Sequence, residues 1–360
     1  LAFPQPFLWL ARAPAEVATK VRSYTLALAF SLPASLLFTV YRGFNIAVSR
    51  PKAVMALQLG GLALKLPLTA AFVFGWGPLP ELGVAGCGIA TAIAMWAQAG
   101  AAWLVLRRDR FYERFEIRGR RLQRPSRAAL AALLALGVPM GLSIAVEVTG
   151  FTFMAFFVSR ISTLAVAGHQ IAANLAALLF MMPLALANAS STLVAQRIGA
   201  GDLEDARGLA RHGLLLGLGL ASMAAIVVAL GRDLLVRLYT HDALVIAAAL
   251  PLVAWLGLFH IFDAAQTIAA FVLRAWRVAT VPFAIYAASV WGIGLGGGWA
   301  LVFGFAERLP AWSLPYVGGA RGFWAASTLG LLCASGGLLL MLRHVQRSAG
   351  HARQATRPRD

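Results

Sequence analysis

Charged side chains are scarce in this 360-residue sequence: Asp, Glu, Lys and Arg make up 12% of it, while 60% of the residues are hydrophobic. A soluble protein of this size needs far more polar surface, so the composition excludes an ordinary soluble domain. Apolar stretches of about 20 residues, enough to cross a bilayer as a helix, recur along the chain. The sequence therefore predicts an all-α polytopic membrane protein.

The motifs of common enzyme classes are also missing. Cys87 and Cys333 lie in apolar segments without the spacing of a metal site, so we expect them to be packing thiols. The sequence has no Walker motif and no nucleophile triad, and the GxG in "RIGAGD" (197–202) lacks the strand that precedes a phosphate loop. These absences disfavour an ATP-driven pump or a membrane hydrolase, and we expect neither enzymatic activity nor a cofactor.

Acidic residues are few, with 14 Asp and Glu against 31 Lys and Arg, which gives a formal net charge of +17. Such a charge can indicate nucleic-acid binding, but the basic residues cluster at the ends of apolar stretches, in the loop 107–127 and in the tail 343–360. This distribution is typical of cytoplasmic segments that face anionic lipid. We therefore expect membrane lipids and no nucleic acid as partners, with the C-terminus in the cytoplasm.

Length and hydropathy predict nine complete spans and the remnant of a tenth at 1–10. Alternation from the basic loop 107–127 places "VSRPK" (48–52), "LRAWR" (273–277) and the tail on its side of the membrane, where they act as cytoplasmic anchors. The predicted spans are 24–47, 53–75, 83–106, 129–158, 164–195, 210–231, 244–273, 279–304 and 319–342.

The chain also contains an internal repeat. The segment 53–75 can be laid over 282–304, both ending in Val-Phe-Gly, and 83–108 over 319–344. Six spans separate the two copies, and this even number inserts both with the same orientation. Parallel repeats related by an axis along the membrane normal are typical of transporters.

Three segments carry a family resemblance: "GVPMGLSIAVEVTGF" (137–151), the long stretch 165–213 that begins "AVAGHQIAANLAALLF", and "FDAAQTIAAFVLRAWRVATVPF" (262–283). They resemble the MATE family of multidrug and toxic-compound extrusion transporters, in particular its NorM-like members, and the similarity extends over nearly the whole chain.

The resemblance implies two six-helix lobes around a central cleft, with the first two family helices and most of the third missing here. On that template, 1–107 is a partial N-lobe with the end of helix 3 and helices 4–6. The segment 108–128 is the cytoplasmic loop between lobes, 129–345 is a C-lobe with helices 7–12, and 346–360 is a basic cytoplasmic tail.

Two carboxylates are the principal candidate site residues. A charge at the centre of a membrane helix costs about 2.5–3.5 kcal/mol, so such residues usually face a cavity and mark ion pathways. In NorM-like members a glutamate of the seventh helix and an aspartate of the tenth form a cation site, and the resemblance maps these onto Glu147 and Asp263. We expect them to bind the coupling ion, H⁺ or Na⁺, and expect no other metal; a buried carboxyl held by neighbours is the structural alternative.

Asp263 has polar neighbours on its own helix. His260 and Gln266 lie three residues before and after it, on the same helical face. His260 is a candidate proton relay, because imidazole has an unperturbed pKa of about 6.5. The alternative is a supporting role in which His260 and Gln266 only position the carboxylate.

Other candidates for a cavity lining come from polar or aromatic residues within spans. Lys65 sits too deep to reach the interface easily, and Gln170 and Asn174 stack on one helical face. Phe153 and Trp291 are candidates because aromatic rings suit flat organic cations. For each of these residues, ordinary packing or an interhelical hydrogen bond is the alternative explanation.

The combined prediction is a monomeric secondary active multidrug efflux antiporter of the bacterial inner membrane. It exports cationic or amphipathic compounds, the drugs or toxic organic cations that the resemblance implies, in exchange for H⁺ or Na⁺. Three alternatives stay open: a lipid-linked oligosaccharide flippase of the same superfamily, for which an arginine-rich cleft is expected; a non-transporting membrane scaffold or receptor; and a non-functional fragment of the transporter.

Overall fold

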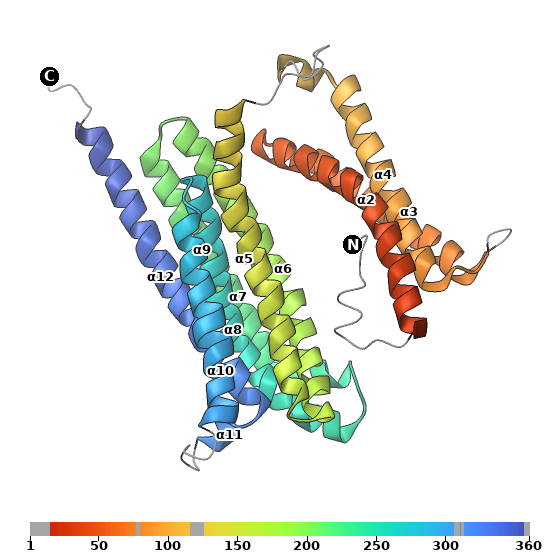
Figure 1. Ribbon diagram of the computed structural model, residues 1–360. Helices are drawn as coiled ribbons and strands as arrows, with labels where there is room; N and C mark the ends of the chain where they lie inside the picture. Colours follow the sequence, from red (N-terminus) through yellow and green to blue (C-terminus); the bar gives the residue numbers. More distant parts are fainter. Residues whose placement is uncertain (1–14, 77–79, 116–125, 306–309, 311–312, 356–360) are drawn as a thin grey trace. The chain divides into compact units, whose positions relative to one another are not determined.

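The computed structural model describes residues 15–76, 80–115, 126–305, 310 and 313–355. The span remnant predicted at 1–10 lies outside these residues. Within the described ranges the regular structure is entirely helical (Figure 1). Nine of these helical segments are long and apolar enough to cross a membrane. The prediction of an all-α polytopic protein with nine complete spans is confirmed.

The chain divides into two compact units, Leu1–Arg124 and Pro125–Asp360. Unit 1 contains α2 (Ala15–Ala47), α3 (Pro51–Phe74), α4 (Gly83–Arg108) and the short 3₁₀-helix η1 (Arg110–Phe115). Unit 2 contains the remaining elements: α5 (Arg127–Ser159), α6 (Thr163–Gly199), α7 (Leu203–Arg237), α8 (Ala243–Ala275), α9 (Thr280–Ala287), η2 (Ala288–Gly296), α10 (Gly297–Trp299), η3 (Ala300–Gly304), α11 (Leu314–Val317) and α12 (Ala320–Ala355).

Side-chain caps begin the long helices of unit 2. The hydroxyls of Ser126 and Ser162 accept hydrogen bonds from the backbone N–H groups three residues further on. At the starts of α7 and α8, the carboxylates of Asp202 and Asp242 accept hydrogen bonds from the backbone N–H groups of Asp205 and Leu244. These caps satisfy backbone donors that the first helical turn leaves without partners.

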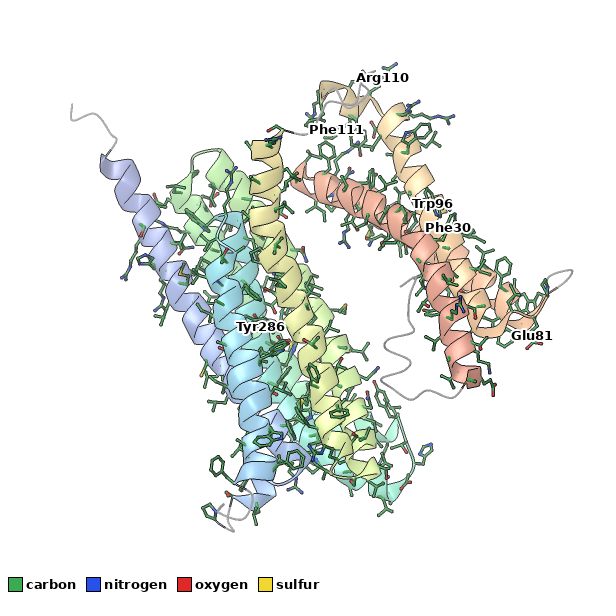
Figure 2. All side chains as sticks on the ribbon, in the orientation of Figure 1. Phe30, Glu81, Trp96, Arg110, Phe111 and Tyr286 are labelled. Atoms are coloured by element: carbon green, nitrogen blue, oxygen red, sulfur yellow. The ribbon has the colours of Figure 1, made fainter. Side chains whose placement is uncertain are left out.

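In unit 1, α4 packs against both α2 and α3. At one end of the unit, Arg50 forms an ion pair of 2.5 Å with Asp109, and the hydroxyl of the buried Tyr112 donates a hydrogen bond of 2.6 Å to Asn45. These contacts hold η1 against the connection between α2 and α3. Figure 2 shows Phe111 at this end and Glu81 at the opposite end.

Unit 2 is organised around α8, which packs against α6, α7 and α12. Its buried residues extend from Ile246 to Leu273, and they contribute to both hydrophobic clusters of the unit. Because α8 is surrounded on several sides, polar groups on it have little access to solvent. The helix therefore fixes the position of the acidic residue that it carries.

The span predicted as one helix at 279–304 is irregular. It begins as α9, and its glycine-rich part follows π-helical winding in η2 and η3. It lies so close to α12 that a Cβ on Gly330 would be 2.6 Å from the carbonyl oxygen of Ser289. Hydropathy could not predict the π-helical turns, because it carries no information on the hydrogen-bond pattern within a span. Such turns often occur at functional sites.

Several helices are longer than the predicted spans, and α2 and α12 are two clear examples. α2 begins at Ala15 instead of 24, and α12 continues to Ala355, into the segment expected as a tail from 346. The added segments are polar but rich in Ala, Arg, Gln and similar helix-forming residues. Hydropathy measures what a bilayer accepts, and so it underestimates how far a helix extends beyond the bilayer.

The close approach at Gly330 gives a stability prediction. Gly330→Ala should destabilise the protein by about 1–3 kcal/mol, because the added methyl group meets a backbone carbonyl that has little freedom to move. Gly336→Ala, on the same helix with no atom within 4 Å of the added Cβ, is the matched control. It should leave stability unchanged or raise it by about 0.5–1 kcal/mol. Thermal unfolding in detergent compares the two, and equal melting temperatures would contradict the predicted contact.

Candidate functional site

Two cavities lie inside unit 2. The first, named here the carboxylate cavity, has a volume of about 420 Å³ and is lined by Glu147 of α5 and Asp263 of α8 together with apolar and aromatic residues. The second, named the arginine cavity, has a volume of about 300 Å³ and is lined by Glu147 and by Arg274 near the end of α8. Four residues line both cavities: Glu147, Val148, Phe180 and Tyr286.

The carboxylate cavity brings together the two acidic residues that the sequence singled out. Glu147 and Asp263 come from different helices and are near enough for their charges to repel each other. The Nε2 atom of Gln266 donates hydrogen bonds to Asp263 Oδ1 at 3.3 Å and to the hydroxyl of Thr267 at 2.9 Å. The site therefore combines two acceptor groups with an amide that orients one of them.

Aromatic rings form much of the remaining wall. Phe151, Phe259 and Trp324 line the carboxylate cavity. Phe259 makes edge-on contacts with the other two rings at centroid distances of 6.2 and 5.4 Å. The hydroxyl-bearing ring of Tyr286, which is labelled in Figure 2, belongs to both cavities. An apolar, aromatic chamber with two acidic groups can accept a cation.

The structure places the predicted aromatic residues elsewhere. Phe153 and Trp291 line neither cavity, and their side chains are 45% and 46% exposed. A helical turn takes about 3.6 residues, so Phe153 projects to the side of α5 away from Phe151. The Nε1 atom of Trp291 donates a hydrogen bond of 3.2 Å to the carbonyl of Val146. The aromatic lining comes from other rings.

His260 is buried, with 1% of its surface exposed, and its Nε2 atom has no hydrogen-bond partner. It is not among the residues that line the two cavities, and the described hydrogen bonds join Asp263 to Gln266 instead. The geometry therefore supports Gln266 as the positioning neighbour. The relay role of His260 stays a prediction.

The other polar candidates also lie outside the two cavities. Gln170 and Asn174 are exposed on α6, and the hydroxyl of Tyr239 donates a hydrogen bond of 2.7 Å to Asn174. This bond between α6 and the end of α7 matches the structural alternative for Asn174. Lys65 is half-buried on α3 and belongs to unit 1, whereas both cavities belong to unit 2.

Sequence reasoning overlooked Tyr286 and Trp324 as cavity residues, and it treated Arg274 only as an anchor at the end of a span. A hydroxyl in the apolar run "PFAIYAAS" (282–289) is a weak signal for Tyr286. Nothing in the local pattern distinguishes Arg274 from other basic residues at helix ends. Its position in a cavity depends on the packing of α5, α6, α8 and α9.

The described residues contain no group of three or more His, Cys, Asp or Glu side chains that could hold a metal ion. A cation at Glu147 and Asp263 would have two carboxylates and nearby neutral oxygens as its ligands. Hard monovalent and divalent cations take oxygen ligands of this kind, whereas sites for zinc use nitrogen and sulfur more often.

Comparison with known proteins places the chain in a family. The family model described as MatE matches residues 139–299. The chain is 43% identical over 350 residues to a probable multidrug resistance protein NorM of Aromatoleum aromaticum, covering 96% of this chain and 73% of that protein. It is 32% identical to the multidrug resistance protein PmpM of Pseudomonas aeruginosa, covering 96% and 70%.

Solved structures agree on the fold. The crystal structure of the eukaryotic MATE transporter AtDTX14 aligns with a TM-score of 0.81 at 20% identity, covering 96% of this chain and 74% of that one. The Vibrio cholerae MATE transporter VcmN in its bent form aligns with a TM-score of 0.75 at 20% identity, with the same coverage. The described residues also include nine helices of membrane-spanning length, and the relatives are bacterial. The chain is therefore a multi-pass inner-membrane protein. It belongs to the MATE family of transporters, not to a family of enzymes.

Proposed function

We propose that this protein is a secondary active multidrug efflux antiporter, which exports cationic or amphipathic compounds in exchange for H⁺ or Na⁺. The observation that carries the proposal is the pair of carboxylates, Glu147 and Asp263, facing one largely apolar cavity inside a membrane protein. The names of the bacterial relatives, multidrug resistance proteins NorM and PmpM, support the substrate class.

The electrostatics of the carboxylate cavity explain why an ion would enter it. Two ionised carboxylates in an apolar chamber repel each other and have lost much of their hydration, which costs several kcal/mol for each ion. A proton or a Na⁺ ion shared between them removes part of this cost. The cavity therefore attracts a small cation, and occupancy of the cavity changes the force between α5 and α8.

This change of force couples ion binding to drug export. Ion binding favours one arrangement of the unit 2 helices, and ion release favours another, because each arrangement gives Glu147 and Asp263 a different separation. A ligand shifts such an equilibrium by its difference in affinity for the two states. Binding from the outside would favour drug release, and ion loss to the cytoplasm would restore the drug-accepting state.

The direction of ion movement follows from the topology. Basic residues in the last turns of α4 and α8 support a cytoplasmic location for these helix ends. The arginine cavity then lies on the cytoplasmic side of Glu147, and the carboxylate cavity lies toward the outer face. An entering ion meets Asp263 and Glu147 before it reaches the region of Arg274.

The coupling role predicts the effect of Asp263→Asn. Drug efflux should fall by about tenfold or more, since the typical coupling free energy of 1–3 kcal/mol corresponds to factors of 5–150. Export of a fluorescent organic cation from proteoliposomes, driven by an imposed pH gradient or by an imposed Na⁺ gradient, measures this loss and identifies the ion. Asp233→Asn, at an exposed site near the end of α7, is the matched control and should transport normally. Full ion-driven export by Asp263→Asn would overturn the proposal.

The topology is tested by labelling introduced cysteines. With Cys87 and Cys333 replaced by serine, Ser348→Cys on α12 should react with a membrane-impermeant thiol reagent only in inside-out vesicles. Glu81→Cys, at the opposite end of unit 1 from η1, should react only from the outside of right-side-out vesicles (Figure 2). Both side chains are exposed, so access depends on the membrane alone. The reverse labelling pattern would contradict a cytoplasmic C-terminus.

A further inference from the structure

Glu147 occupies a position with two different electrostatic environments. In the carboxylate cavity its charged companion is Asp263, whereas in the arginine cavity it is Arg274. Among the described residues, no other Asp, Glu, Lys or Arg lines either cavity. Glu147 is therefore shared between a chamber that would bind a cation and a chamber that already contains one.

Arg274 contacts an aromatic ring on its own helix. Its guanidinium lies over the ring of Phe271, with the Cζ atom 4.1 Å from the ring centroid. The salt bridges between described residues do not include one from Arg274 to Glu147. The two side chains nevertheless line the same cavity and interact electrostatically. Arg274 thus lies near Glu147 without being bound to it.

The energies favour movement of Arg274 when Glu147 has no other partner. A cation–π contact contributes about 0.5–2 kcal/mol. A buried carboxylate without a partner costs several kcal/mol, and a guanidinium can satisfy it with two parallel hydrogen bonds. An ion-free site would therefore draw Arg274 from Phe271 toward Glu147, while an ion bound between Glu147 and Asp263 would remove that attraction.

We infer that Arg274 is a tethered counter-ion for Glu147, which binds Glu147 after the coupling cation has left and returns to Phe271 when the next cation enters. The inference rests on the proposed function, in which Glu147 and Asp263 hold that cation. It assigns to Arg274 a positioning role beyond that of a membrane anchor. It also assigns to Phe271 the role of holding Arg274 away from the site.

If Arg274 competes with the cation for Glu147, substitutions of Arg274 and of Phe271 should have opposite effects on cation affinity. Arg274→Gln removes the competitor, so the protein should bind the coupling cation about fivefold more tightly or better. It should also release the cation more slowly and export drug at a lower maximal rate. Phe271→Leu removes the resting position of Arg274, which should then remain near Glu147 and weaken cation binding by a similar factor.

Equilibrium binding to the purified protein in detergent tests these effects. The probes are radioactive ²²Na⁺ and protons, the latter measured with a pH-sensitive dye in weakly buffered solution. Arg274→Lys keeps the charge but cannot form the two parallel hydrogen bonds, so its cation affinity should lie between those of the wild type and of Arg274→Gln. Arg277→Gln removes an exposed positive charge three residues away, outside both cavities, and is the matched control. It should leave binding unchanged.

The outcomes separate this inference from the proposed function. If Asp263→Asn loses cation binding while Arg274→Gln binds as the wild type does, or more weakly, the counter-ion role is overturned and the ion site stands. If Asp263→Asn and Glu147→Gln both bind cations normally, the proposed function itself fails. Should Arg274→Gln not fold, Phe271→Leu decides alone: weaker binding supports the inference, and unchanged or tighter binding overturns it.

Discussion

The cost of placing charge among apolar helices governs the arrangement of unit 2. Glu147, Asp263 and Arg274 lie within largely apolar helices, and each must be hydrated, paired or neutralised. In the structure these groups line two cavities, and the carboxylate of Glu147 belongs to both. In a transporter this cost is useful. A site whose ion-free state is high in free energy binds its ion readily, and its helices are expected to rearrange when the ion leaves.

The helices around α8 must pack firmly, whereas the ion site must be able to change. With little hydrophobic driving force between helices in lipid, close approach through small residues supplies much of their association. Gly330 against Ser289 shows how little space separates α12 from η2. On α8 itself, the hydrogen bond from Gln266 orients the carboxylate of Asp263.

The sequence predicted the nine spans, because length and hydropathy are local properties that the bilayer selects. It also identified Glu147 and Asp263, through the rarity of carboxylates in membrane helices and through a family resemblance, and the structure places both on one cavity. Phe153, Trp291 and Asn174 do not line this cavity, because the rotation of each helix depends on its neighbours. Arg274 looked like any basic residue at the end of a span, and only the packing of four helices brings it into the same cavity as Glu147.

The two acidic residues lie on helices that are held to very different degrees. In the most apolar window of α8, 44% of the residues are buried, compared with 11% for α5. Asp263 therefore lies on a helix that unit 2 packs on several sides, whereas Glu147 lies on a helix with fewer buried residues. A helix with fewer packing contacts shifts at lower cost, so we expect a force between the carboxylates to move α5 more than α8.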